Sequence, residues 1–410
     1  MKTQFKEQLT CLEMFAGAGG LAQGMHQAGI QHLAFVERNK PACETLRLNF
    51  PAVEVFEGDI REFHTQNVAP IDILSGGPPC QPFSLGGKAQ GNKDKRDMFP
   101  YAIRVLREKQ PKAFIFENVK GLLRESFSTY FEYILLQLTY PELALKSGEM
   151  WQEHLERLER VHTSGQTAGM TTYKPVFRLV NAADYGVPQK RERVIIVGIR
   201  SDLHMAWNFP EPTHTKEKLL WDQWVTGDYW EEHEVPQSKR PVLSEREAKS
   251  VQKMSGRLFP PLGERWLTVR DALKGLPSPY TQDENGSQSF IGHLFRDGAR
   301  IYPGHTGSEI DLPSKAIKAG DHGVPGGENM IRFPDGTVRY FTVRETARIQ
   351  TFPDEYLISG VWTEAMRQLG NAVPVKLAHI ISKSLVSKLS NVTENQKHSN
   401  RPVRLLCLRK

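Results

Sequence analysis

Short apolar runs alternate with helical patterns through the first 200 residues, and this alternation restricts the fold more than any other feature of the chain. Strand-like runs occupy residues 9–15, 32–36, 53–56, 71–74, 113–116 and 194–199. Helical patterns lie among them at residues 20–28, 41–49 and 98–108. Alternation of this kind is typical of a parallel sheet with helices on both faces. We therefore expect an α/β fold built on one large sheet.

The pattern changes after residue 200. Residues 201–340 hold 12 of the 26 prolines and have poor helical periodicity, which predicts a smaller, loop-rich second domain. Residues 124–172 are expected to form a helix-rich insertion, and residues 343–350 and 373–389 are expected to be helical. The predicted domains are 1–204, completed by about 355–390, then 205–354, then a basic tail over 391–410.

Composition excludes several classes of protein. The chain has 410 residues, 39% of them hydrophobic, and no run of about 18 apolar residues, so we expect a folded protein without a membrane-spanning helix. The N-terminus has no apolar signal core. The four cysteines lie far apart without a C-x-x-C pair, so neither a zinc site nor a disulfide framework is expected. These features predict a cytoplasmic location.

Most of the excess positive charge lies at the end of the chain. The chain contains 53 basic and 47 acidic residues, a net charge of +6. Residues 376–410 contain eight basic residues and one acid, which gives +7 and leaves about −1 for residues 1–375. The charge permits nucleic-acid binding without requiring it, and a solvated basic tail is the alternative.

A glycine-rich turn, Phe15-Ala-Gly-Ala-Gly-Gly20, follows the first predicted strand and opens a helix. Such a turn lets the backbone approach a cofactor, and the helix N-terminus favours polar or anionic groups. Glu37 ends the second predicted strand, 20 positions after Gly17, where a carboxylate can bind ribose hydroxyls. Asp59 ends the third and could accept a hydrogen bond from an adenine amine. A tight turn or an NAD site fits nearly as well, and an aspartate such as Asp59 is often a turn residue.

A second constellation follows the fourth and fifth strands. In Gly76-Gly-Pro-Pro-Cys-Gln-Pro-Phe-Ser84, three prolines stiffen the turn that carries Cys80. A polar, proline-locked loop is a poor place for a packing residue, so Cys80 is a candidate nucleophile if its surroundings favour the thiolate. Glu117 in Phe116-Glu-Asn-Val119 would lie nearby and could donate a proton. The alternative role for Glu117 is a helix-capping carboxylate.

The third candidate segment is Gln189-Lys-Arg-Glu-Arg193, which leads into the last predicted strand. Alternation along an extended chain would place Gln189, Arg191 and Arg193 on one face. Their guanidinium groups could hold a phosphate or a base carbonyl, whereas a solvated charge run is the alternative. Arg344 and Arg348 lie one helical turn apart further along, and Gly370-Asn-Ala-Val-Pro374 is a predicted turn.

Taken together and in this order, these segments resemble the cytosine-5 DNA methyltransferases of the bacterial, restriction-modification type. The resemblance spans roughly residues 10–200 and 335–385, and Pro-Pro-Cys-Gln-Pro-Phe-Ser is its most specific string. It implies a Rossmann-like sheet that binds S-adenosyl-L-methionine rather than NAD, with S-adenosyl-L-homocysteine as product and no metal. It also implies that the enzyme flips a cytosine out of double-stranded DNA, at a cost of a few kcal/mol.

The resemblance assigns roles by position. Cys80 matches the nucleophile that adds to C6 of cytosine, Glu117 matches the residue that contacts N3 and the exocyclic amine, and Arg193, with Arg191 beside it, matches the residues that hold the base. Expected cofactor contacts are Phe15, Ala16, Gly17, Gly19, Glu37, Asp59, Ile60, Pro79, Met98 and Asn371. Expected DNA contacts are Gln81, Ser84, Arg191 and Arg193.

DNA recognition is expected from the second domain and from the basic loop 81–97, which could close over DNA or simply be an exposed loop. The resemblance implies a monomer with no membrane partner, and a cognate restriction endonuclease as functional partner. Two alternatives remain. An RNA cytosine methyltransferase usually carries Cys-Phe-Thr in its second domain, and this chain has no such tripeptide. A silent DNA-binding regulator would be expected to lack the nucleophile or the glycine turn.

Overall fold

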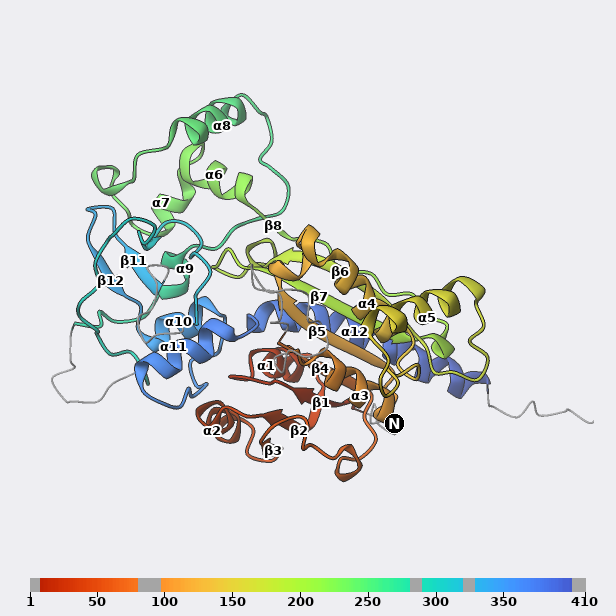
Figure 1. Ribbon diagram of the computed structural model, residues 1–410. Helices are drawn as coiled ribbons and strands as arrows, with labels where there is room; N and C mark the ends of the chain where they lie inside the picture. The colour runs from red at the N-terminus through yellow and green to blue at the C-terminus, as the bar shows by residue number, and fades with distance from the viewer. Residues whose placement is uncertain (1–7, 80–96, 281–289, 320–328, 400–410) are drawn as a thin grey trace, which may run out of the picture.

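The computed structural model describes residues 8–79, 97–280, 290–319 and 329–399, with side chains up to Ser390. Its main feature is a seven-stranded sheet in the order β3-β2-β1-β4-β5-β7-β6 (Figure 1). The strands are β1 Thr10–Met14, β2 Gln31–Glu37, β3 Glu54–Glu57, β4 Ile73–Gly76, β5 Ala113–Val119, β6 Tyr173–Asn181 and β7 Glu192–Arg200. Strands β1 to β5 pair in parallel, and β7 runs antiparallel to both β5 and β6. The predicted α/β fold is confirmed.

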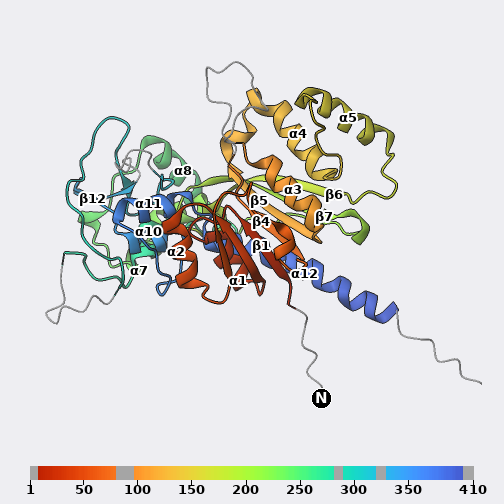
Figure 2. The same cartoon turned by 60° about the horizontal axis from the view of Figure 1, so that its bottom comes forward.

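Helices cover both faces of this sheet (Figures 1 and 2). They are α1 Gly20–Gln27, α2 Lys40–Asn49, α3 Phe99–Lys109, α4 Ser128–Thr139, α5 Trp151–Ser164 and α12 Val375–Ser399. Alternate strand residues serve two cores: Leu12 and Phe114 pack toward α3 and α4, whereas Cys11 and Ile115 pack toward α1 and α12. The last helix thus packs on the first domain as expected, although it runs beyond the predicted end at residue 389.

Strand β6 is absent from the sequence-based prediction. It lies at the edge of the sheet and pairs only with β7. Several of its nine residues are exposed or half-buried, so it lacks the continuous apolar run that marks a strand buried on both faces. Pro175 is tolerated there because an edge strand has one side without a hydrogen-bonded neighbour.

A smaller unit with short elements lies beside the carboxyl ends of the strands (Figure 1). Its helices are α6 Lys216–Trp224, α7 Asp228–Glu232, α8 Glu245–Ser255 and α9 Val269–Leu273. Its strands are β8 His214–Thr215, β9 Glu264–Arg265, β10 Ser308–Glu309, β11 Met330–Arg332 and β12 Val338–Tyr340. Helices α10 Val343–Ile349 and α11 Trp362–Asn371 lead back to the large sheet. The smaller loop-rich second unit is confirmed as part of the fold.

Short 3-10 helices complete the secondary structure. They are Thr65–Asn67, Lys120–Leu123, Glu125–Phe127, Ala182–Tyr185, Ser201–Leu203 and Gln237–Lys239. No helix within the described residues is both long enough and apolar enough to cross a membrane.

Candidate functional site

The carboxyl ends of β1 and β4 form the centre of the site. Because β2 lies on one side of β1 and β4 on the other, the chain leaves these two strands in opposite directions. Open α/β sheets bind their ligands in the crevice that such a reversal creates. The glycine-rich turn follows β1, and Gly77-Pro-Pro79 follows β4.

The glycine turn has a conformation that leaves free space at one position. Phe15 and Gly17 have φ values of 55° and 54°, in the left-handed region. A Cβ added to Gly17 would meet no atom within 4 Å. By contrast, a Cβ on Gly19 would lie 2.5 Å from Tyr356 Oη, and one on Gly20 would lie 2.2 Å from the Val373 carbonyl oxygen. Gly17 therefore borders open space, whereas Gly19 and Gly20 pack against the protein.

Glu37 fixes the glycine turn to the end of β2. Its Oε2 accepts a hydrogen bond from the Gly17 N–H at 2.8 Å, and its Oε1 accepts from the N–H groups of Arg38 and Asn39 at 2.9 and 2.8 Å. Phe15 N–H adds a bond of 2.8 Å to the Val36 carbonyl oxygen. A carboxylate is therefore held beside the one glycine of the turn that borders open space.

Asp59 lies beyond β3, next to β2 in the sheet. Arg61 donates to both of its carboxylate oxygens, at 2.9 and 2.5 Å, and these bonds lower the pKa of Asp59 to about 2. The carboxylate is therefore ionised at neutral pH. The neighbouring Ile60 is buried, and its carbonyl oxygen accepts from Arg104 Nη2 at 2.8 Å.

The remaining predicted cofactor residues are less alike in their positions. Ala16 and Met98 are buried, and the Met98 N–H donates to the Pro79 carbonyl oxygen at 3.1 Å. The structure thus brings Met98 and Pro79 together. Asn371 is exposed at the last position of α11.

An ion pair joins β5 to β7 at the same edge of the sheet. Arg193 Nε lies 2.6 Å from Glu117 Oε1, with its N–H not aimed along the contact. Arg193 Nη1 also donates to the Glu192 carbonyl oxygen at 2.8 Å. Glu117 is only 9% exposed. A largely buried carboxylate with a single cation beside it can be held in a fixed orientation toward a bound group.

The turn that leads to Cys80 lies directly against this ion pair. A Cβ added to Gly77 would be 3.2 Å from Glu117 Oε2. Asn118 Nδ2 donates to the Pro78 carbonyl oxygen at 2.9 Å, which pins the turn to β5. Cys80 itself lies outside the described residues, as do Gln81 and Ser84. The sequence analysis gave Asn118 no role, although it is part of the Phe116-Glu-Asn-Val119 string.

Arg191 has a different environment from Arg193. It is 1% exposed, and its Nη1 and Nη2 donate to the carbonyl oxygens of Ile317 and Gly370 at 2.9 and 2.6 Å. Burial lowers the pKa of Arg191 to about 9. Gln189 supports the same junction, since its Oε1 accepts from the Ile317 N–H at 3.0 Å. The geometry does not support the base or DNA contact expected of Arg191 and indicates a positioning role instead.

Two further predicted residues of the later helix also hold backbone. Arg344 is buried and donates to the carbonyl oxygens of Ile291, Pro353 and Tyr356 at 2.9 to 3.1 Å. Arg348 forms an ion pair of 2.6 Å with Asp354. Tyr356, which no local pattern marks, donates to the Ala18 carbonyl oxygen at 2.7 Å and so supports the glycine turn from behind.

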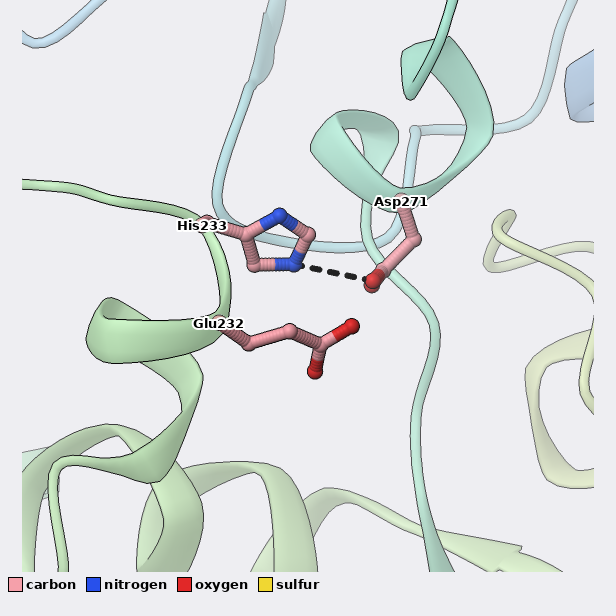
Figure 3. Close-up of side chains that lie close together, drawn as sticks. All are labelled: Glu232, His233 and Asp271. Atoms are coloured by element: carbon pink, nitrogen blue, oxygen red, sulfur yellow. Dashed lines mark hydrogen bonds and ion pairs between the residues drawn. The ribbon is translucent and has the colours of Figure 1, made fainter.

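One group of acids and a histidine in the described part of the chain has a spacing that could hold a metal ion (Figure 3). It comprises Glu232, His233 and Asp271. However, Arg265 donates to Asp271 at 2.7 and 2.9 Å and to Glu232 at 2.9 Å, and Lys274 also pairs with Glu232. His233 Nε2 donates to Asp271 at 2.9 Å. The carboxylates are already neutralised, so this group is a structural ion-pair network.

The sheet order, the glycine turn after β1 and the acidic residue at the end of β2 define the class: a Rossmann-like methyltransferase fold of the kind that binds S-adenosylmethionine. The family model for C-5 cytosine-specific DNA methylases matches residues 9–140 and 150–387. The chain therefore belongs to the C-5 cytosine-specific DNA methylase family.

Individual relatives agree with this assignment. The chain is 34% identical to type II methyltransferase M.Sau96I of Staphylococcus aureus, over 92% of this chain and 76% of that protein. It is 32% identical to type II methyltransferase M.NgoMIV of Neisseria gonorrhoeae, over 93% of this chain and 98% of that protein.

Solved structures share the fold. The crystal structure of the Dnmt2 methyltransferase of S. pombe aligns with a TM-score of 0.51 at 18% identity, covering 95% of this chain and 99% of that one. A putative DNA modification methyltransferase encoded within an E. coli prophage also aligns, with a TM-score of 0.51 at 21% identity over 93% and 99% of the two chains.

Proposed function

We propose that this protein is a sequence-specific DNA (cytosine-5-)-methyltransferase that uses S-adenosyl-L-methionine. The observation that carries the proposal is the position of the Glu117–Arg193 ion pair. It lies against the proline-rich turn that leads to Cys80, at the edge of the sheet where the glycine turn and Glu37 also lie. One short stretch of this sheet edge thus carries a candidate nucleophile, a base-orienting pair and a cofactor cradle.

The residues at the cradle fit the cofactor. Gly17 leaves room where any side chain would project, and Glu37 supplies carboxylate oxygens for ribose hydroxyls beside it. Asp59 is ionised and can accept from an adenine amine. When bound, S-adenosylmethionine supplies the electrophilic methyl group, and its product is S-adenosyl-L-homocysteine.

The chain's own residues prepare the base. The Cys80 thiolate adds to C6 of a flipped cytosine, and the electron pair of the C5–C6 double bond then makes C5 nucleophilic. Glu117 hydrogen-bonds N3 and the exocyclic amine, which stabilises the charge that develops during this addition. Arg193 holds Glu117 and the base in register. Loss of the C5 proton followed by cleavage of the sulfur–C6 bond releases Cys80.

The biological setting follows from the relatives. M.Sau96I and M.NgoMIV are named type II methyltransferases, and we extend this restriction-modification role to the present chain. The proposal includes action in the cytoplasm as a monomer on double-stranded DNA, with a restriction endonuclease as functional partner and without a metal.

The direct test offers purified protein and isotopically labelled S-adenosylmethionine to duplex DNA and, separately, to transfer RNA. We expect label at C5 of cytosine in DNA and none in RNA. Label in RNA alone would contradict the proposed acceptor. A folded, cofactor-binding protein that labels neither nucleic acid would contradict the enzymatic role and indicate a silent DNA-binding regulator.

A further inference from the structure

Helix α8 of the smaller unit has two chemically different sides. Val251 and Met254 face inward and pack with Leu220 and Trp221 of α6. The helix starts at Ser244, whose hydroxyl accepts from the Glu247 N–H at 3.4 Å. The rest of the helix surface is exposed (Figure 1).

One flank of this exposed surface is basic. Arg246, Lys249 and Lys253 are spaced by three and four residues, so at about 100° per residue they fall within an arc of about 60°. All three are exposed, and no acid among the described residues lies within ion-pair distance of them. Arg257 follows just beyond the helix and is also exposed. The opposite flank carries uncharged residues: Ala248, Gln252 and Ser255.

The stability of the helix does not explain this arrangement. Arg246 lies in the first turn, where a positive charge opposes the helix dipole by a few tenths of a kcal/mol. Glu247, the acid nearest to the basic flank, is already paired with Lys216 at 3.0 Å. Because the basic flank gains nothing from the fold, it is available for a partner outside the chain.

An apolar tip continues directly from the basic flank. Leu258, Phe259 and Leu262 are 87%, 74% and 93% exposed. Pro260 and Pro261 lie between them and stiffen the segment. Single exposed apolar residues are common, but three within five positions beside four cations form a surface of mixed chemistry.

We propose that α8 and this tip bind duplex DNA outside the methylated sequence, an inference that rests on the proposed function. The stripe from Arg246 to Lys253 is about 10 Å long at 1.5 Å per residue, which matches about three phosphates of one strand. The chain outside its tail has almost no net charge, so this local excess of cations is well suited to a phosphate backbone. The apolar tip then packs into the adjacent groove, as apolar side chains of minor-groove binders do.

Phosphate contacts position a protein on DNA without reading its sequence. The α8 surface should therefore raise the affinity for DNA and leave both the turnover rate and the methylated sequence unchanged. Each lost phosphate contact lowers the slope of log affinity against log salt by about 0.9. Loss of three contacts would make affinity about 40-fold less sensitive to a fourfold rise in salt.

The test compares the variant R246Q/K249Q/K253Q with a control of equal charge change, K146Q/R160Q/K174Q. The control residues are exposed and lie on α5, just before it and on β6, away from the smaller unit (Figure 1). Binding of a long duplex is measured between 50 and 200 mM salt, and turnover is measured at saturating DNA. We expect weaker binding and a salt slope lower by about 2 to 3 for the α8 variant only.

A second variant tests the apolar tip. Phe259→Ser should weaken DNA binding and leave the salt slope unchanged, because no phosphate contact is lost. An α8 variant that binds like the parent protein, or a control that loses as much affinity, would overturn the inference. The proposed function has a separate outcome: it fails if the parent protein does not methylate DNA, whereas the α8 inference alone fails if the parent methylates DNA and the α8 variant binds normally.

Discussion

Replacement of Arg191 by methionine separates a positioning residue from a base-holding one. Arg191 is 1% exposed, and its two terminal nitrogens satisfy the carbonyl oxygens of Ile317 and Gly370. Methionine fills similar space without donors, so both carbonyls would be buried and unpaired at about 1–3 kcal/mol each. Removing a buried cation returns part of this cost, because burial disfavours the charge and lowers the pKa of Arg191. We expect the free energy of unfolding to fall by about 1–4 kcal/mol.

Urea denaturation measures this change, and steady-state methylation of duplex DNA completes the comparison. Because Ile317 and Gly370 belong to segments 126 and 179 residues away in the sequence, their release should raise KM for DNA more than it lowers kcat. Arg193→Met is the matched control on the same strand. Loss of the contact to Glu117 should lower kcat by about 100-fold or more.

A stable Arg191→Met protein with a collapsed kcat would refute this reasoning. It would show that Arg191 acts on the base directly, as the spacing of Gln189, Arg191 and Arg193 first indicated. Unchanged stability together with unchanged kinetics would show that the two carbonyl oxygens find other donors, and would remove Arg191 from the junction.

Three further predictions concern the cofactor cradle and the ion-pair network. Gly17→Ala should fold with a cost of about 1–2 kcal/mol for its left-handed backbone and lose affinity for S-adenosylmethionine by calorimetry, whereas Gly20→Ala should unfold at much lower urea because its Cβ would meet the Val373 carbonyl oxygen. Equal cofactor binding by Gly17→Ala and the parent would refute the cradle. Glu37→Ala should weaken cofactor binding, and unchanged affinity would remove Glu37 from the site. Although burial opposes ionisation of Asp271, hydrogen bonds from His233 and Arg265 lower its pKa, so its contribution to stability is complete above about pH 4 and declines as pH falls further. Asp271→Asn should therefore cost about 2–4 kcal/mol at pH 7 and less at pH 3, and a cost independent of pH would contradict this assignment.

The large sheet could be predicted because its central strands are buried on both faces. Residues such as Leu12 and Cys11 serve opposite cores, so their strand appears as an unbroken apolar run. Strand β6 could not be predicted, since an edge strand with one neighbour tolerates exposed and charged residues. The extension of α12 to Ser399 was missed because its last residues have no apolar pattern.

The candidate site was predictable where its residues are close in sequence to a strand end. Glu37 and Glu117 are examples, because parallel strands bring their carboxyl ends to one edge. The different environments of Arg191 and Arg193 were not predictable. Alternation places both on one face, but only the fold reveals that Ile317 and Gly370 cover Arg191 while Arg193 reaches Glu117.

The central claim is that Cys80 is the nucleophile of a DNA cytosine-5 methyltransferase. The most direct measurement expresses the parent protein and Cys80→Ala in a host without cytosine methylation and maps 5-methylcytosine at base resolution. Binding of DNA and of S-adenosylmethionine by the purified variant confirms that it is folded. The account predicts methylation at one short recurring sequence with the parent protein and none with the variant. Methylation that persists in Cys80→Ala would contradict it.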